Sequence, residues 1–157
     1  ALNLAVHRLE NKKYDLDFVR EIIEQAAIVY DSKKSSILEL GGGVPKNTAQ
    51  QTGPLLDQIL RRNDGGQNYI IQITDARPDT GGLSGATLQE GKSWGKIQDS
   101  HEGIVTVYAD ATIVFPILAL YVLSNQKSRK PKRLYKRIGE MYDKLSDDYF
   151  KSPTRAK

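Results

Sequence analysis

Hydrophobic residues between positions 17 and 30 recur every three or four residues, which is the spacing of one face of an α-helix. Asp15 or Asp17 can cap this helix by accepting hydrogen bonds from its first backbone N–H groups. The polar residues in between would face water, so we predict an amphipathic helix that packs on the rest of the domain. Its apolar face consists of Phe18, Ile22, Ile23, Ala26, Ala27 and Tyr30.

Three short apolar runs, at residues 35–40, 68–73 and 104–108, are typical of buried strands. Because loops and helical segments alternate with them, we predict an α/β fold with a parallel, doubly wound (Rossmann-like) sheet flanked by helices and a helical C-terminal tail. Such sheets bind ligands at the carboxyl ends of their strands. We therefore expect one crevice there, formed by residues 41–47, 74–96 and 110–112.

Two further helices are expected around these strands. Pro54 can begin a helical turn, since its missing N–H group is not needed in a first turn. The longest apolar stretch, residues 109–123, is shorter than the ~20 residues that cross a bilayer. We therefore predict a buried helix there and no membrane span. The buried positions that follow Pro54 would be Leu55, Leu56, Ile59 and Leu60.

The C-terminal part of the chain is basic. The formal net charge is +4, and the excess lies mainly between Lys127 and Arg137. Interleaved aromatic residues and a known binding motif are missing there, which favours a solvated tail over a nucleic-acid surface. We place a domain at residues 1–125, and a basic linker with a terminal helix at residues 126–157. The packing stripe of that helix is Leu134, Ile138, Met141, Tyr142, Leu145 and Tyr149.

The amino-acid composition argues against two kinds of site, disulfides and metal centres. Hydrophobic residues make up 39% and charged residues 27% of the 157 residues, which is ordinary for a globular domain. With no cysteine and only two histidines in the chain, we expect no disulfide and no metal site. Residues 1–11 lack the order of a secretory leader, so we expect a cytoplasmic protein without a membrane partner.

The segment 82–97 places a lysine beside a tryptophan after a glycine-rich loop. Lys96 is a candidate nucleophile, because an aromatic wall such as Trp94 can exclude water and favour an uncharged, reactive amine. Glu90 and Trp94 offer a carboxylate and an aromatic face, which suit the ammonium groups of a polyamine. Each feature taken alone is more typical of a solvated surface.

Two more segments frame this loop. Residues 41–47 read Gly-Gly-Gly-Val-Pro-Lys-Asn, and residues 108–112 read Tyr-Ala-Asp-Ala-Thr. The glycine triplet is not a spaced phosphate-binding fingerprint and by itself indicates a tight turn. Together with the Ser-Trp-Gly-Lys-Ile run at residues 93–97, these blocks resemble the C-terminal half of the deoxyhypusine synthase family. The resemblance runs from about Phe18 to about Ser124.

That resemblance implies an enzyme that transfers an aminobutyl group from spermidine to an acceptor amine, with NAD as cofactor. Lys96 would carry the group as an imine, while Glu90, Trp94 and Asn47 would bind substrate. The family precedent is a tetramer with sites between subunits, and a chain carrying the N-terminal half of the fold is an expected partner. The implied NAD contacts are Ser84, Gly85, Asp110 and Ala111, although Asp110 can equally cap a helix.

Two positions depart from the family pattern. Asn47 stands where the family usually has a histidine, and Leu83 stands where an aspartate is expected before the Ser-Gly pair. The sequence around these two positions is more similar to that of the bacterial deoxyhypusine synthase-like branch. This favours a small acceptor such as putrescine slightly over a protein lysine. A non-catalytic regulatory paralogue is the alternative function, and a basic nucleic-acid-binding module ranks third.

Overall fold

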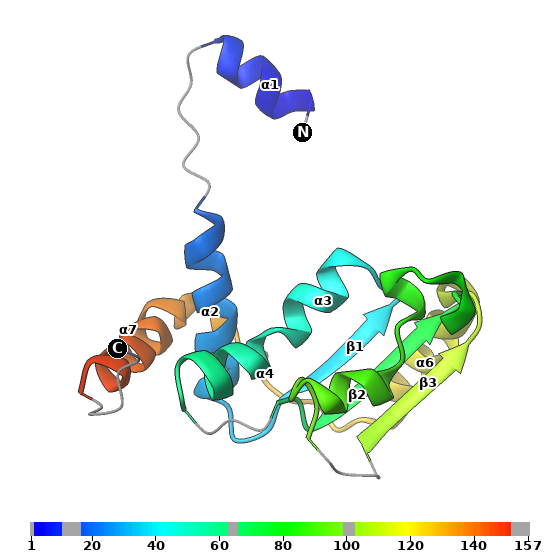
Figure 1. Ribbon diagram of the computed structural model, residues 1–157. Coiled ribbons are helices and arrows are strands. Elements are labelled where there is room, and N and C mark those ends of the chain that lie inside the picture. The colour runs from blue at the N-terminus through cyan, green and yellow to red at the C-terminus, as the bar shows by residue number, and fades with distance from the viewer. Residues whose placement is uncertain (1, 11–16, 63–65, 99–102, 152–157) are drawn as a thin grey trace.

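A three-stranded parallel sheet forms the centre of the computed structural model, which describes residues 2–10, 17–62, 66–98 and 103–151 (Figure 1). The strands lie in the order β1-β2-β3 and alternate with helices along the chain. The predicted α/β fold with a parallel, Rossmann-like sheet is confirmed. The strands are β1 (Ser36–Leu40), β2 (Tyr69–Thr74) and β3 (Ile104–Tyr108).

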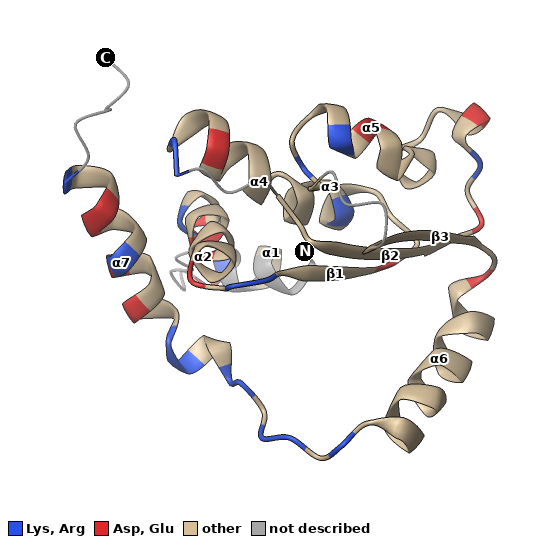
Figure 2. Cartoon of the chain, turned by 90° about the horizontal axis from the view of Figure 1, so that it is seen from below, with Lys and Arg blue, Asp and Glu red and all other residues tan. Residues whose placement is uncertain are grey.

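Helices lie on both sides of this sheet. Figure 2 shows α3 (Val44–Gln50) and α5 (Leu88–Ser93) on one side and α6 (Ala111–Asn125) on the other. In the described part of the chain, no helix has the length and apolar character needed to cross a membrane. The other helices and turns are α1 (Leu2–Leu9), α2 (Phe18–Tyr30), α4 (Thr52–Pro54), the π-helical turn η1 (Leu55–Ile59), η2 (Pro78–Thr80), η3 (Leu83–Gly85), η5 (Leu134–Lys136) and α7 (Ile138–Lys151).

The pair α2 and α7 forms a hydrophobic core beside the sheet. Asp17 caps α2 by accepting a hydrogen bond from the Arg20 backbone N–H at 2.9 Å, as the sequence predicts. Ala26 of α2 is fully buried, and Met141 and Leu145 of α7 are each only 2% exposed. The predicted stripe of the terminal helix therefore packs where its spacing indicates.

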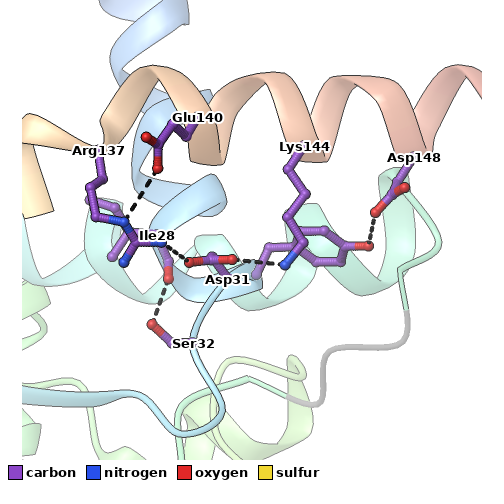
Figure 3. A network of polar contacts seen from close by, with 8 residues as sticks. Ile28, Asp31, Ser32, Arg137, Glu140, Lys144 and Asp148 are labelled. Atoms are coloured by element: carbon purple, nitrogen blue, oxygen red, sulfur yellow. Dashed lines mark hydrogen bonds and ion pairs between the residues drawn. The ribbon is translucent and has the colours of Figure 1, made fainter.

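Polar contacts border this core (Figure 3). Asp31 accepts hydrogen bonds from Lys144 at 2.7 Å and from Arg137 at 3.2 Å, and the Lys144 bond is the main cause of a lowered pKa of Asp31. The Tyr30 hydroxyl donates to Asp148 at 2.7 Å. Because exposed ion pairs add little to stability, these contacts mainly fix the register of two helices that apolar packing holds together.

The helical region after β1 begins earlier than expected. It starts at Val44, with Pro45 in the first turn, and Pro54 lies within continuing helical structure instead of beginning it. The Leu60 N–H bonds to the Leu55 carbonyl at 2.8 Å, five residues back, so η1 is wider than an α-helix. This extra residue turns Ile59 outward, and the expected burial of Ile59 is wrong because it is 63% exposed.

The helix predicted over residues 109–123 forms as α6, but the expectation that it is buried is wrong. Ile117 and Leu120 are each 67% exposed, and no residue of α6 is fully buried. The described part of the chain covers only a part of this helix. An apolar sequence predicts which residues favour burial. It does not predict which segment packs against them.

Removing part of the α2–α7 core should weaken the fold. We expect Leu145→Ala to lower the free energy of unfolding by about 2–5 kcal/mol, the usual cost of a cavity at a buried leucine. Val19→Ala, at a 68% exposed position of α2, should change it by less than about 0.5 kcal/mol. Urea unfolding followed by circular dichroism measures both variants, and equal effects would contradict this account of the core.

Candidate functional site

A cavity of about 140 Å³ lies between α3 and α5. It brings together four residues singled out by the sequence: Asn47, Glu90, Trp94 and Lys96. Leu83, one of the two departures from the family pattern, also lines it. The remaining lining residues are Lys46, Gln50, Ala86, Thr87 and Gly91.

Lys96 is held at both its backbone and its side chain. Its Nζ donates a hydrogen bond to Asn47 Oδ1 at 2.9 Å. Its backbone N–H bonds to the Gly91 carbonyl at 2.9 Å, and its carbonyl accepts from the Gln67 N–H at 3.0 Å. The half-buried lysine is thus tied to α5, to α3 and to the segment that leads into β2.

Two glycines allow the backbone of Lys96 to approach so closely. A Cβ atom on Gly53 would lie 2.7 Å from the Gly95 carbonyl oxygen, and one on Gly66 would lie 2.6 Å from that of Lys96. Gly66 also has a φ of +82°, which side-chain-bearing residues rarely adopt. Any larger residue at these positions would push the Lys96 backbone away from its hydrogen-bond partners.

Lys46 is a second lysine of this cavity, which the sequence analysis did not single out. It is only 7% exposed, and its Nζ donates to the Ala86 carbonyl at 2.6 Å. Burial lowers the pKa of Lys46; the nearby carboxylate of Glu39 opposes this shift, and the charge of Lys96 adds to it. Lys46 could have been found from its position in the sequence, because it lies three residues after the glycine triplet and directly before Asn47.

Glu39 introduces a carboxyl group beneath α3. It is 4% exposed, and its Oε1 accepts a hydrogen bond from Gln50 Nε2 at 2.6 Å. Among the described residues, its Oε2 has no hydrogen-bond partner. Burial raises the pKa of Glu39, while the bond from Gln50 and the charge of Lys46 act in the opposite direction. The cavity therefore lies above a buried polar layer of Glu39, Gln50 and Lys46.

The outer wall of the cavity is open. Trp94 is 66% exposed and Glu90 lies on the exposed side of α5. We expected Trp94 to exclude water from Lys96. In this chain taken alone that expectation is wrong, because the indole is largely in solvent. Thr87 caps α5 through its Oγ1, which accepts from the Glu90 N–H at 3.3 Å, and this fixes the backbone that carries both side chains.

The four residues assigned to NAD do not line this cavity, although Ser84 and Gly85 lie between two residues that do, Leu83 and Ala86. Ser84 packs against Gly42, and its carbonyl accepts from Gln72 Nε2 at 2.9 Å. Asp110 Oδ1 caps α6 by accepting from the Thr112 N–H at 2.7 Å, and the hydrogen bonds from Thr112 lower the pKa of Asp110. The single crevice expected from the sequence is thus divided in two. Gly85 and Ala111 are the other residues of this second group.

An open hollow of about 600 Å³ lies at the carboxyl ends of β2 and β3. Asp75, Arg77 and Tyr108 line it, and Pro78 and Ala109 complete it. The glycines Gly41 and Gly81 have positive φ, and neither would meet an atom within 4 Å of an added Cβ. The guanidinium and the carboxylate of this hollow are groups that suit the phosphates and ribose of a dinucleotide, although Ser84, Gly85, Asp110 and Ala111 do not line it.

Most of the chain matches a known protein family. The model of the deoxyhypusine synthase family matches residues 1–122. This chain belongs to the deoxyhypusine synthase family. The match includes the residues of both the cavity and the hollow, and it ends within α6.

Relatives in this family are found in bacteria and archaea. A deoxyhypusine synthase-like protein of Nostoc sp. (strain PCC 7120) is 44% identical over 94% of this chain and 40% of its own length. One of Thermosynechococcus vestitus is 42% identical over 99% of this chain and 41% of its own. A probable deoxyhypusine synthase 2 of Methanosarcina acetivorans is 41% identical over 75% of this chain and 34% of its own length. The chain thus spans about two fifths of the cyanobacterial relatives' length.

The raised pKa of Glu39 predicts a pH dependence of stability. Folding favours its protonated form, and this contribution is complete below the ordinary value of 4.5 and is lost as the pH rises through the folded pKa. The amide introduced by Glu39→Gln cannot ionise, so we expect the free energy of unfolding of this variant, relative to wild type, to rise between pH 4 and pH 7. Urea unfolding at several pH values measures this.

Glu21→Gln is a matched control, because Glu21 is an exposed carboxylate of α2. Its difference from wild type should stay nearly constant over the same range. A Glu39→Gln difference that is equally flat, or that falls with pH, would contradict the buried, proton-binding carboxyl.

Proposed function

We propose that this chain carries the aminobutyl-transfer site of a spermidine-dependent transferase, in which Lys96 holds the transferred group as an imine. The observation that carries the proposal is the grouping of Lys96, Glu90 and Trp94 around one cavity. An amine nucleophile, a carboxylate and an aromatic face are what a reaction on a polyamine requires. Membership in the deoxyhypusine synthase family supports the same chemistry.

Lys96 has the geometry of a positioned nucleophile. Its backbone is fixed by two hydrogen bonds, and Asn47 Oδ1 accepts a hydrogen bond from its Nζ at 2.9 Å. Asn47 would orient the amine for attack, and as a neutral amide it does not itself take up the proton that the amine loses. Lys46, the other amine of the cavity, already donates to the Ala86 carbonyl and is nearly inaccessible. We therefore assign the imine to Lys96.

Glu90 and Trp94 would bind the polyamine chain. The carboxylate of Glu90 would pair with one ammonium group, and the indole face of Trp94 would lie along the methylene groups and a neighbouring charge. Glu90 lies on α5, whose first turn is capped by Thr87, and Trp94 is the residue at which this helix ends. Their spacing along one helix turn directs them to the same end of the cavity.

NAD fits the proposal as the cofactor. Ser84, Gly85, Asp110 and Ala111, with the hollow lined by Asp75 and Arg77, would contribute one wall of its site. The chemistry that NAD would supply when bound is hydride transfer out of the polyamine and back into the product. The residues of this chain would orient the polyamine and hold the amine that forms the imine.

A small amine such as putrescine is the acceptor that we favour over a protein lysine. Leu83 lines the cavity and cannot pair with an ammonium group, whereas an aspartate at this place could. Asn47 offers a neutral acceptor where an imidazole is usual. A cavity with fewer charged partners suits an acceptor that brings its second ammonium group to Glu90.

We also propose that the working site needs polypeptide beyond this chain, in an oligomer with sites between subunits. Trp94 is 66% exposed, and an aromatic face binds a cation more strongly once water is excluded. A second wall over Trp94 and Glu90 would provide that exclusion and complete the cofactor site.

The imine can be trapped directly. We expect incubation of the native assembly with labelled spermidine and NAD, followed by borohydride and peptide mapping, to mark Lys96. Lys96→Ala should remove the label, whereas Lys46→Arg should retain it on Lys96. A label found on Lys46, or recovered at the wild-type level from Lys96→Ala, would refute the assignment. A protein that binds spermidine but never acquires label would instead be the non-catalytic paralogue.

Loss of the Glu90 charge should weaken polyamine binding. Glu90→Gln is expected to raise the Kd for spermidine about tenfold, the lower end of the effect of a charge-assisted hydrogen bond, because Glu90 is exposed. Calorimetry on the native assembly measures it. Gln89→Ala changes the preceding exposed residue of α5 outside the cavity lining and should leave the Kd unchanged. Equal affinities of Glu90→Gln and wild type would remove Glu90 from the site.

A further inference from the structure

The turn that carries Lys96 directly follows α5 and closes that helix. The Gly95 N–H bonds to the Lys92 carbonyl at 3.0 Å. The Lys96 N–H bonds to the Gly91 carbonyl at 2.9 Å. With the positive φ of Gly95 (+70°), these two bonds form a Schellman motif, a common end of an α-helix. The motif satisfies two of the last carbonyl groups of α5 and does not use the carbonyl of Trp94.

Gln58 supplies a hydrogen bond to that remaining carbonyl. Its Nε2 donates to the Trp94 carbonyl oxygen at 3.1 Å, across 36 residues of sequence. The same nitrogen lies beside Gly95, where an added Cβ would come within 3.4 Å of it. Gln58 therefore lies against the turn immediately before Lys96.

The position of Gln58 depends on the π-helical turn η1. In this turn the Leu60 N–H bonds to the Leu55 carbonyl, so one residue more than in an α-helix is enclosed. Each residue of an α-helix advances the chain by about 100° around the axis, so the extra residue decides which side chain faces the end of α5. Single turns of this kind are frequent at functional sites.

The backbone of η1 is held by a core that does not include α5. Leu56 of η1 is fully buried and belongs to the cluster that contains Ala26, Met141 and Leu145. Gln58 lies on the same turn, so only the rotamer freedom of its side chain is lost when its hydrogen bond forms. The bond from Gln58 therefore ties the end of α5 to the α2–α7 core.

We propose that Gln58 is a positioning residue of the aminobutyl-transfer site, which acts through the Trp94 carbonyl on the orientation of the indole and of Lys96. Its effect on catalysis rests on the proposed function, whereas its restraint on Trp94 follows from the hydrogen bond alone. Because Trp94 is 66% exposed, its backbone largely directs its side chain. Asn47 restrains Lys96 at the end of its side chain, and Gln58 restrains the main chain that leads to it.

The restraint on the indole is measured by time-resolved fluorescence anisotropy, because Trp94 is the only tryptophan of the chain. Trp94→Phe gives the background signal. Gln58→Met removes the donor at similar length, and we expect a larger part of the anisotropy to decay through fast local motion. Gln58→Lys retains a donor and should restore most of the wild-type decay. Gln58 is exposed, so the variants should fold, and circular dichroism checks this.

The effect on catalysis is measured on the native assembly as the rate at which borohydride-trapped label forms on Lys96. At saturating spermidine, Gln58→Met should lower this rate about two- to tenfold, the range of one neutral hydrogen bond, and leave the Kd for NAD unchanged. Gln58→Lys should recover most of the rate. Gln51→Met is the matched control, since Gln51 is exposed in the same helical region and its side chain has no hydrogen bond with the described residues.

Equal indole motion in Gln58→Met and wild type would overturn the inference. So would a change that Gln51→Met reproduces or that Gln58→Lys does not reverse. Faster indole motion with an unchanged rate of labelling would refute the positioning role in catalysis. A wild-type assembly that forms no label would refute the proposed function, while faster indole motion in Gln58→Met would still support the restraint on Trp94.

Discussion

The close backbone contact of Gly95 and Lys96 with Gly53 and Gly66 is the constraint on which the site depends. It requires the absence of a Cβ at both glycines, because such an atom would lie within 2.7 Å of a carbonyl oxygen. The contact lets Gln67 pair with the segment around Lys96 and so joins the end of α5 to the start of β2. Lys96 is therefore positioned by main-chain geometry, and its side chain needs only Asn47 to direct it.

Beneath this contact, the covered face of the sheet is polar where an apolar core would be usual. Glu39, Lys46 and Gln72 are each less than 10% exposed, and hydrogen bonds tie them to α3 and to the loops before α5. Burial moves the pKa values of Glu39 and Lys46 toward their neutral forms, and their mutual attraction opposes both shifts. Such a layer gives less stability than hydrocarbon packing. It does fix where α3 lies and hence where Asn47 meets Lys96.

Features that depend on the local spacing of residues could be predicted from the sequence. The strands at 36–40, 69–74 and 104–108, the Asp17 cap and the buried Met141 and Leu145 follow from periodicity and end signals. The grouping of Asn47 with Lys96 came from a family resemblance, since 49 residues separate the two and no local rule relates them. Lys46 was missed because its burial depends on a segment distant in the sequence, which includes its hydrogen-bond acceptor Ala86. The π turn at Leu55–Ile59 was missed because one inserted residue changes every later position of a helical stripe.

The cavity around Lys96 and the exposed apolar side chains of α6 lie on opposite sides of the sheet. The cavity around Lys96 is built on the side of α3 and α5, and all the groups that fix this lysine belong to the described chain. Leu38, Ile71 and Val105, which pair in register across the strands, lie with α6 on the other side and are exposed. Covering these three side chains would stabilise the strands that end at the hollow without touching Lys96. A wall over Trp94 would instead change the water content of the cavity. The two sides are joined through the three strands, so we expect a substitution in α6 to lower the stability of the sheet before it alters the geometry of Lys96.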